Sequence, residues 1–437
     1  MNTIAIDCGA SFIKGALFDQ ETIVKRTHRK SPAVHGSGNI LDAVQLSKLL
    51  PLVEDLIDEL ADGVTDFKLC ISNEMHGFLL ANEEGKPYTD YISWQKEYGN
   101  EMIDGESSVE ILSRPEYKDA IFRTGMPLRG GLPSSNLFYL KRKRLINNTP
   151  LYFYTLGDFI IRHISGKEPM CHPTNAAATG LYDVTSSAWN KELLSIVANK
   201  EVKFPIVGNT VIEFDFKGRH VACYPAIGDQ QAALLGAGVE KVSDISFNLG
   251  TGAQVSRLVT EAKLSQEYQI RPYFNNYWLM TVPHLPSGRA MNVYFRFFKE
   301  ILKTFGVEKD DAEIWQVLLE EEKKCDSTEL QCDLSFFQTP LTDHETGSVG
   351  NIGEYGLTVG KLMKAIIRQM GQNFTVIANL IFPDKSKIER IVFSGGVARR
   401  INSLREEILK NYHQGMPVVV AEEETLHGLL KYGRNER

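Results

Sequence analysis

Asp229 is the first residue whose type and setting could do chemistry. It stands in AIGDQQAALLGAG, residues 226–238, between a glycine and a run of alanine and leucine. A carboxylate ahead of a small-residue helix is typical of an N-cap, which accepts hydrogen bonds from free backbone N–H groups. A carboxylate can also take a proton from a reacting hydroxyl. The segment alone favours the cap, so a catalytic role needs support from elsewhere in the chain.

Two glycine turns give that support. The stretch IAIDCGASFIKGALF, residues 4–18, aligns without gaps on ISFNLGTGAQVSRLV, residues 245–259. In each, an apolar strand ends on a polar residue, Asp7 or Asn248, and a glycine follows two positions later, Gly9 or Gly250. Glycine lets backbone N–H groups turn toward an anion without a Cβ in the way, so each hairpin could hold phosphate oxygens. For either turn alone, a plain hairpin is the alternative.

A third glycine element lies near the C-terminus. KIERIVFSGG, residues 387–396, predicts an apolar strand that ends on Gly395 and Gly396, followed by a helix with apolar residues at Ile401, Leu404 and Ile408. This arrangement brings backbone close to a nucleotide, although a plain strand-to-helix turn has the same pattern. Residues 356–382 before it predict one long helix with an apolar stripe.

The order of elements predicts an α/β fold. Strands are expected over 3–7, 12–18, 22–28 and 67–72, with a helical stretch over 41–61. The repeated hairpins suggest duplicated domains facing each other across a cleft, where ligand sites preferentially form. A boundary is expected near residues 224–227, where proline and glycine precede the second hairpin, giving domains 1–224 and 225–437.

Composition narrows the class of protein. A chain that is 43% hydrophobic and 24% charged is typical of a soluble globular protein, and a net charge of −7 argues against nucleic acid as a partner. The basic run KRKR, residues 141–144, is interpreted as the solvated end of a helix beginning near Asn136. Without a secretory leader or a long apolar run, we expect a cytoplasmic chain with no membrane partner. The six cysteines form no C-x-x-C pair and are expected to be reduced and packed.

Together these segments resemble the FGGY family of carbohydrate kinases, which belongs to the actin and hexokinase ATPase superfamily. The two hairpins, GDQQAALLGAG and SGGVA occur in the family's order, and the resemblance covers essentially the whole chain. NEMHGFLL, which begins at residue 73, looks like the family's substrate segment, and Met-His-Gly at 75–77 is especially similar to the kinases for xylulose and sedoheptulose. The resemblance implies two actin-like, ribonuclease H-like ATPase domains and ATP-dependent phosphorylation of a ketose hydroxyl.

The resemblance also implies a role for each matching residue. Asp229 matches the family's general base, and Asp7 matches the aspartate near Mg²⁺. Because a carboxylate has two oxygens, Asp229 could cap its helix as well. The expected sugar contacts are Asp229, Gln230, Met75, His76 and Trp94. The expected ATP contacts are Gly9, Ser11, Lys14, Gly250, Thr251, Gly252, Gly288, Asn292, Gly395 and Gly396.

Departures from the family pattern keep a second hypothesis open. Ala10 stands where members commonly have threonine, and WQKEY places Lys96 and Tyr98 where many carry an aspartate and an arginine. The second change leaves the sugar unidentified. The alternative to an enzyme is a weak or inactive family member that binds nucleotide or sugar as a regulator, but the retention of Asp7 and Asp229 favours the enzyme. A small sugar is the expected partner, and a homodimer stays open.

Overall fold

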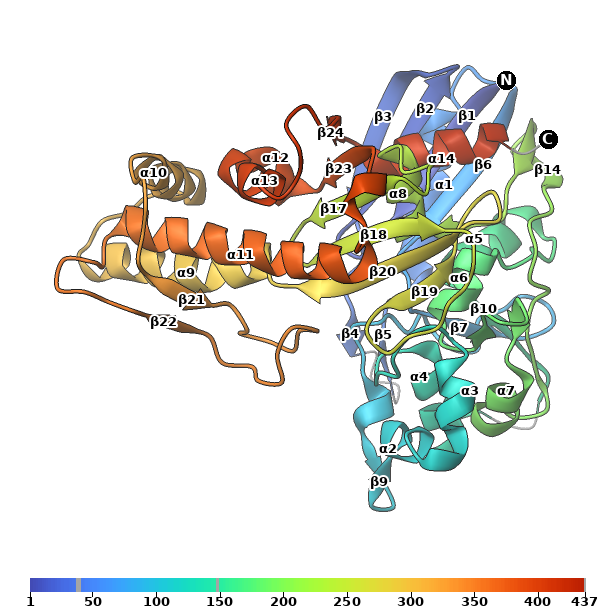
Figure 1. The fold of residues 1–437 in the computed structure, drawn as a ribbon. Coiled ribbons are helices and arrows are strands. Elements are labelled where there is room, and N and C mark those ends of the chain that lie inside the picture. The colour runs from blue at the N-terminus through green and yellow to red at the C-terminus, as the bar shows by residue number, and fades with distance from the viewer. Residues whose placement is uncertain (37–40, 147–148, 436–437) are drawn as a thin grey trace. The chain divides into compact units, whose positions relative to one another are not determined.

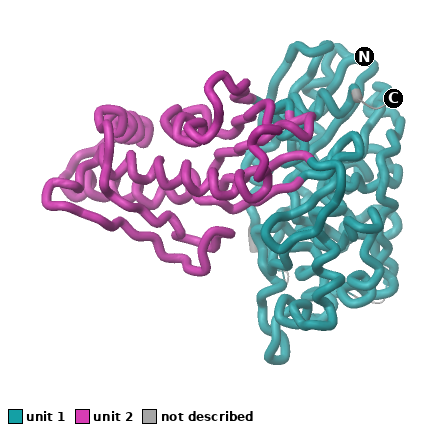
Figure 2. Tube along the Cα trace, viewed as in Figure 1, with its two compact units in different colours: residues 1–238, 259–279, 423–437 teal, residues 239–258, 280–422 magenta. Residues whose placement is uncertain are grey.

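The computed structural model describes residues 1–36, 41–146 and 149–435. Two compact units make up the chain (Figure 2). Unit 1 comprises residues 1–238, 259–279 and 423–437, and unit 2 comprises residues 239–258 and 280–422. Unit 1 therefore includes the segment around Asp229 and the C-terminal residues. The division into domains 1–224 and 225–437 stays a prediction.

Unit 1 is built on a seven-stranded sheet (Figure 1). The strands run in the order β14-β15-β6-β1-β2-β3, and β16 also pairs with β6. β1, β2 and β3 are successively antiparallel, whereas β6 is parallel to β1, β15 and β16. The bounds are β1 (Asn2–Cys8), β2 (Phe12–Asp19), β3 (Thr22–Lys30), β6 (Asp66–Asn73), β14 (Ile212–Phe216), β15 (Arg219–Cys223) and β16 (Ile227–Gly228). The four strands expected from the sequence are confirmed.

Two helices cover opposite faces of this sheet, α1 (Leu46–Leu60) and α14 (Glu424–Asn435). Ile4 and Ile6 of β1 share a hydrophobic core with Leu56 of α1. Thr3 faces the other way, since a Cβ on Gly433 of α14 would lie 3.9 Å from its methyl group. Successive strand residues point to opposite faces, so Asp7 lies on the face that α14 covers.

The remainder of unit 1 is mostly helical. Part of it has a core of its own, which includes Phe78, Leu137 and Phe153, whereas α5 contributes to the core of the large sheet. Its helices are α2 (Ser108–Leu112), α3 (Lys118–Phe122), α4 (Pro133–Arg142), α5 (Leu156–Ser165), α6 (Pro173–Ala178) and α7 (Lys191–Val197). A small sheet joins β7 (Leu79–Ala81), β10 (Leu151–Tyr154) and β13 (Val202–Lys203). Two-stranded pairs are β4 (His35–Gly36) with β5 (Asp42–Ala43), β8 (Met102–Ile103) with β9 (Glu106–Ser107), and β11 (Tyr182–Asp183) with β12 (Ala188–Trp189).

The basic run at 141–144 differs from the expectation. Its helix, α4, begins at Pro133 rather than near Asn136. The ammonium group of Lys141 donates to the carbonyl oxygens of Ile196 and Ala198, at 2.7 and 2.9 Å. Arg142 likewise donates to main-chain carbonyl oxygens. The run is therefore only partly solvated, because two of its cations bind the backbone of neighbouring segments.

Unit 2 repeats the strand order of unit 1. Its sheet runs β20-β18-β17-β23-β24, which matches β3-β2-β1-β6-β15, and in both sheets an antiparallel hairpin is followed by two parallel neighbours. The strands are β17 (Asp244–Leu249), β18 (Ala253–Val259), β20 (Trp278–Leu285), β23 (Arg390–Ser394) and β24 (Val418–Val420), with a separate pair β21 (Gln331–Asp333) and β22 (Ser348–Gly350). The helices are α9 (Gly288–Thr304), α10 (Asp311–Lys323), α11 (Val359–Ile381), α12 (Gly396–Arg400) and α13 (Asn402–Leu409). The predicted α/β duplication is confirmed.

The two repeated hairpins differ by one residue in their turns. Cys8 pairs with Ile13 in the first hairpin, so four residues form the turn. Leu249 pairs with Ala253 in the second, so three residues suffice. The gap-free sequence alignment therefore holds for the first strand of each hairpin and slips by one position after the turn.

Two further observations concern the cysteines and the hydrophobicity of the helices. All six cysteines are free thiols, and all except the partly buried Cys325 are buried, as expected. Among the described residues, no helix is long and apolar enough to cross a membrane.

Candidate active site

The centre of the site in unit 1 lies where three parallel strands end. Asp7 of β1 pairs with Ser72 of β6, and Ser72 pairs with Ile227 of β16. The hydroxyl of Ser72 donates to Oδ1 of Asp7 at 2.9 Å. Ligands of α/β sheets bind at the carboxyl ends of parallel strands, and this edge brings the two predicted aspartates, Asp7 and Asp229, into one neighbourhood.

Asp229 is the first residue of α8 (Asp229–Gly236), and Gly228 occupies the N-cap position. The prediction that Asp229 is the N-cap is therefore wrong by one residue. Its Oδ1 nevertheless accepts the free N–H of Gln230 at 2.7 Å. Burial, followed by the nearby charge of Asp7, raises the pKa of Asp229 from 3.8 to about 7. A carboxylate with such a pKa can both hold and release a proton near neutral pH.

Small residues and two helices fix the backbone at Asp229. The N–H of Gly228 donates to the hydroxyl of Thr174 in α6 at 3.1 Å. Asn175, the next residue, donates to the carbonyl oxygen of Ala226 at 2.9 Å. The phenol of Tyr432 in α14 donates to the carbonyl oxygen of Pro225 at 3.1 Å. The chain entering α8 is thus held from both α6 and α14.

The predicted sugar segment follows β6 directly. Glu74 is 6% exposed, and the indole N–H of Trp94 donates to its Oε2 at 3.0 Å. Burial raises the pKa of Glu74. The ring of Trp94 is 49% exposed, which suits it for packing against a sugar. His76 adopts a φ of 67°, and its Nδ1 lies 2.6 Å from the carbonyl oxygen of Ala178.

A buried arginine joins two of the predicted sugar contacts. Arg271 belongs to β19 (Gln269–Pro272) and is 5% exposed. Its Nη1 donates to Oε1 of Gln230 at 2.7 Å and lies 3.8 Å from the sulfur of Met75. Burial, and then the charge of Arg129, lowers the pKa of Arg271 to about 9. The structure thereby places Met75 and Gln230 together, as expected, around a cation that was not expected.

Lys96 and Tyr98 bind another part of unit 1. Nζ of Lys96 lies 2.5 Å from Oδ2 of Asp42, and the phenol of Tyr98 donates to the carbonyl oxygen of Asp42 at 2.9 Å. Both side chains therefore hold the WQKEY segment against β5. The two residues that depart from the family pattern, Lys96 and Tyr98, therefore tether the segment after Trp94 to Asp42.

Three glycine elements meet within unit 2. The N–H of Gly288, at the start of α9, donates to the carbonyl oxygen of Gly250 at 3.1 Å, and the next N–H donates to that of Thr251 at 2.8 Å. Gly395 has a φ of +88°, and a Cβ there would lie 2.5 Å from the carbonyl oxygen of Leu249. Glycine is therefore required at 395. The structure brings together Gly250, Thr251, Gly288 and Gly395, with Gly252 in the same turn, Gly396 next to Gly395, and Asn292 exposed one turn along α9.

The first of the two turns predicted to bind phosphate belongs to unit 1. Its backbone is fixed by Ser31, whose hydroxyl donates to the carbonyl oxygen of Gly9 at 2.6 Å. Ser11 is exposed, and the exposed Lys14 pairs across the hairpin with Asp7. The hydroxyl and the ammonium are thus available to an anion, and Lys14 lies beside the predicted metal-site carboxylate.

The acidic edge fits a divalent cation. Burial raises the pKa of Asp7 to about 6, and Asp7 in turn raises the pKa of Asp229. Carboxylates that repel each other are stabilised by a hard cation, and Mg²⁺ keeps most of its water and needs only one or two protein carboxylates. The described residues contain no group of three or more His, Cys, Asp or Glu side chains placed to hold a metal.

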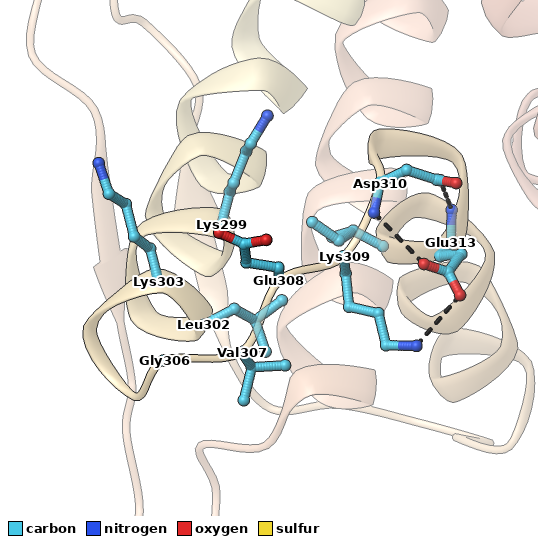
Figure 3. A pocket seen from close by; sticks show the side chains of 10 residues that line it. Lys299, Leu302, Lys303, Gly306, Val307, Glu308, Lys309, Asp310 and Glu313 are labelled. Carbon is cyan, nitrogen blue, oxygen red and sulfur yellow. Dashed lines mark hydrogen bonds and ion pairs between the residues drawn. The ribbon is translucent and has the colours of Figure 1, made fainter.

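An open hollow in unit 2 is lined by none of these predicted residues (Figure 3). It is formed by the end of α9, the start of α10 and the loop between them, including Lys299, Lys303 and Lys309. Lys309 pairs with Glu313 at 3.1 Å, and Asp310 caps α10 through the N–H of Glu313. Lys299 pairs with Asp311 at 2.6 Å. Lys299 and Lys309 are thus paired with acidic side chains, and none of the predicted site residues lines the hollow.

The residues that the sequence left unassigned are Glu74, Arg271 and Arg129, together with Ser72, Thr174 and Asn175 as supports. Glu74 lies inside the segment that resembles the substrate region, so its position was a usable signal. Arg271 follows an ordinary strand pattern, and only its burial reveals it.

Comparisons with known proteins agree with this geometry. A model described as the FGGY family of carbohydrate kinases, N-terminal domain, matches residues 2–236. Sedoheptulokinase of Homo sapiens is 21% identical over 358 residues, which cover 75% of this chain and 70% of that protein. The crystal structure of xylulose kinase from Rhodospirillum rubrum matches with a TM-score of 0.83 at 13% identity, covering 100% of this chain and 90% of that one. Plasmodium falciparum glycerol kinase with ADP matches with a TM-score of 0.77 at 14% identity, covering 98% and 88%.

The family match includes the residues at the centre of the site. It spans more than half of the chain and contains both Asp7 and Asp229. The two solved structures show the same fold over nearly the full length. The chain belongs to the FGGY family of carbohydrate kinases.

Proposed function

We propose that this carbohydrate kinase transfers the γ-phosphoryl group of ATP to a hydroxyl of a ketose, with Asp229 as the general base. The observation that carries the proposal is the position of Asp229 at the start of α8, next to the strand ends that hold Asp7. Oδ1 of Asp229 accepts the N–H of Gln230, which leaves Oδ2 for the sugar hydroxyl. The raised pKa matches a group that takes a proton near neutral pH.

Unit 1 supplies the sugar contacts in this proposal. Trp94 offers the face of its ring, and Glu74 fixes the ring's orientation through the indole N–H. Met75, His76 and Gln230 complete the set. The Met-His-Gly segment supports a ketose, and so do the names of two similar proteins, sedoheptulokinase and xylulose kinase.

Unit 2 supplies the glycine turns that would hold ATP. The use of ATP agrees with the family and with the ADP named for the glycerol kinase structure. Gly250, Gly288 and Gly395 let these turns pack closely on one another, because a Cβ on each would meet main-chain oxygen of a neighbouring residue, and the turns together would hold phosphate and adenosine. Mg²⁺, held near Asp7, would neutralise charge on the phosphates. Ser11 and Lys14 would bind phosphate oxygens from the first turn.

A purely regulatory role is not favoured. Such a protein would not need a base, yet Asp229 is positioned by hydrogen bonds on Gly228 and Gln230 and is coupled to Asp7. A cytoplasmic location and a homodimer remain predictions, which cell fractionation and sedimentation would test.

The test is the Asp229→Asn variant assayed with MgATP and a panel of pentuloses, hexuloses and heptuloses. Asparagine keeps the size and cannot accept the proton, so kcat should fall at least about 10²-fold while ATP binding is unchanged. Asp90→Asn is the matched control, because Asp90 also accepts an N–H at a helix start, that of Leu46 in α1. Turnover by Asp229→Asn near the level of the unmodified protein would show that another group is the base.

A further inference from the structure

Arg271 is a buried cation that has no acidic hydrogen-bond partner among the described residues. Its Nη1 and Nη2 donate to the amide oxygens of Gln230 and Gln269, at 2.7 and 2.5 Å. Its Nε has no hydrogen-bond partner among the described residues, although the side chain is 5% exposed. A buried guanidinium that meets only neutral groups is costly, since its charge has lost water without gaining an anion.

A second cation increases that cost. The charge of Arg129, which precedes α4, is close enough to lower the pKa of Arg271. Burial lowers the pKa of Arg129 as well, with Glu97 acting in the opposite direction. Asp229 acts on Arg271 more weakly than Arg129 does. The buried guanidinium of Arg271 and the partly buried guanidinium of Arg129 therefore repel each other, and an anion between them would relieve both the repulsion and the desolvation.

The location of Arg271 links this unbalanced charge to the sugar site. Its Nη1 lies 3.8 Å from the sulfur of Met75, and Gln230, to which it donates, follows Asp229 in α8. A Cβ on Gly228 would also come within 3.0 Å of that sulfur. Arg271 thus lies next to two of the proposed acceptor contacts, Met75 and Gln230, and Arg129 is close enough to act on its charge.

We propose that the acceptor of this kinase is a sugar acid, an aldonate or a ketoaldonate, whose carboxylate is bound by Arg271 and Arg129. The proposal rests on the kinase function proposed above and extends its acceptor from neutral ketoses to sugar acids. A planar carboxylate matches the fork of a guanidinium. A phosphate ester fits less well, because its second negative charge would be placed near Asp7, Glu74 and Asp229, whose pKa values are already raised.

The decisive experiment compares sugars that differ only at one carbon. Fructose, 2-ketogluconate and fructose 1-phosphate share the same remaining hydroxyls and carry a hydroxymethyl group, a carboxylate or a phosphate ester there. Sorbose with 2-ketogulonate, and sorbitol with gluconate, supply further pairs. We expect kcat/KM for the acid to exceed that of its neutral partner at least 10-fold in one or more pairs, with no turnover of the phosphate ester.

Variants of the cations separate charge recognition from the kinase function itself. Arg271→Gln should lower kcat/KM for the preferred acid at least 100-fold and lower the preference for that acid over its neutral partner at least 10-fold. Arg129→Gln, which leaves β19 intact, should lower the preference for the acid over its neutral partner at least 10-fold. This second variant keeps the test valid if Arg271→Gln does not fold. Thermal shift with the acid alone should show stabilisation of the unmodified protein that both variants lose.

Three outcomes would overturn the proposal. Equal or better use of neutral ketoses, with turnover lost in Asp229→Asn, would leave the proposed kinase function intact and remove the sugar acid. Preference for the phosphate ester would show that the acceptor is a sugar phosphate and not a sugar acid. Phosphorylation of none of these acceptors, nor of any pentulose, hexulose or heptulose in the panel above, would contradict both this inference and the proposed function.

Discussion

Gly428 of α14 packs directly against Ala232 of α8: a Cβ on Gly428 would lie 1.8 Å from the carbonyl oxygen of Ala232. The approach is reciprocal, because a Cβ on Gly236 of α8 would lie 1.7 Å from the carbonyl oxygen of Glu424. Lys431 adds a hydrogen bond to the carbonyl oxygen of Leu235 at 3.2 Å. The C-terminal helix thus sets the position of the helix that begins with the proposed base.

Replacing Gly428 by alanine should therefore impair both stability and catalysis. The methyl group meets backbone rather than a movable side chain, so α8 and α14 must separate, at a cost of about 1–3 kcal/mol. We expect a lower melting temperature and a kcat reduced about 10-fold or more, because a shift of α8 moves Asp229. Thermal unfolding and steady-state kinetics with the best acceptor measure the two effects.

Gly433→Ala is the matched control on the same helix. There a Cβ would meet the sulfur of Cys70 at 2.8 Å, and a side chain can rotate away. Its effect on kcat should be less than half that of Gly428→Ala on a logarithmic scale. If Gly428→Ala retains full kcat at a temperature where it is folded, α14 does not position the base.

The sequence predicts the strands and the glycine turns well because each depends on residues that are adjacent in the chain. Alternation of apolar residues indicated β1, β2 and β3, and Gly395 sits where only a positive φ closes the turn. The return of α14 to unit 1 could not be predicted in this way. That contact depends on two small residues, Gly236 and Gly428, which are far apart in the chain and carry no periodic signal.

The same limit applies to the candidate site. Asp7 and Asp229 could be proposed from motifs, but their raised pKa values follow from burial at the ends of β1 and β16. Arg271 lies in a strand whose pattern shows nothing unusual, and its importance arises only from being buried beside Arg129. From the sequence, Lys96 was only a departure from the family pattern that left the sugar unidentified, and the structure shows that it pairs with Asp42.

The pH dependence of turnover should report Asp229. The base must be deprotonated, and its pKa is raised to about 7. We therefore expect kcat/KM to rise about tenfold per pH unit below pH 7 and to level off above it. The measurement is kcat/KM from pH 5.5 to 9 at constant ionic strength. A profile that is flat between pH 6 and 8 would contradict the role of Asp229 as a base with this pKa.

Asp229 should also make the protein less stable as pH rises. Its pKa is raised on folding from 3.8 to about 7, so the folded state binds the proton more tightly. The free energy of unfolding therefore falls between pH 4 and pH 7 because of this group. Asp229→Asn should melt about 2 °C or more above the unmodified protein at pH 8 and show a smaller gain at pH 5.5. Differential scanning calorimetry checks the sign, and a gain independent of pH would exclude this cause.

Substitutions of the paired glycines at the start of α12 should distinguish an effect on stability from an effect on nucleotide binding. At Gly395 a Cβ would clash with the carbonyl oxygen of Leu249, whereas at Gly396 nothing lies within 4 Å. Gly395→Ala should lower the melting temperature of unit 2. Gly396→Ala should leave it unchanged and raise the KM for ATP about 10-fold, because the open space at Gly396 is the proposed place of the nucleotide. An unchanged KM for ATP in Gly396→Ala would remove that residue from the proposed ATP site.

Lys96 should act on the sugar only through its tether to Asp42. The pair is partly solvated, with side chains 30% and 46% exposed, so its loss should cost no more than about 1 kcal/mol. Lys96→Met should therefore raise the KM for the sugar at most about fivefold and leave the KM for ATP unchanged. Asp42→Asn should give the same change, and the double variant should be no worse than either single one, since both remove one interaction. A 50-fold increase in Lys96→Met that Asp42→Asn does not reproduce would show instead that Lys96 contacts the sugar directly.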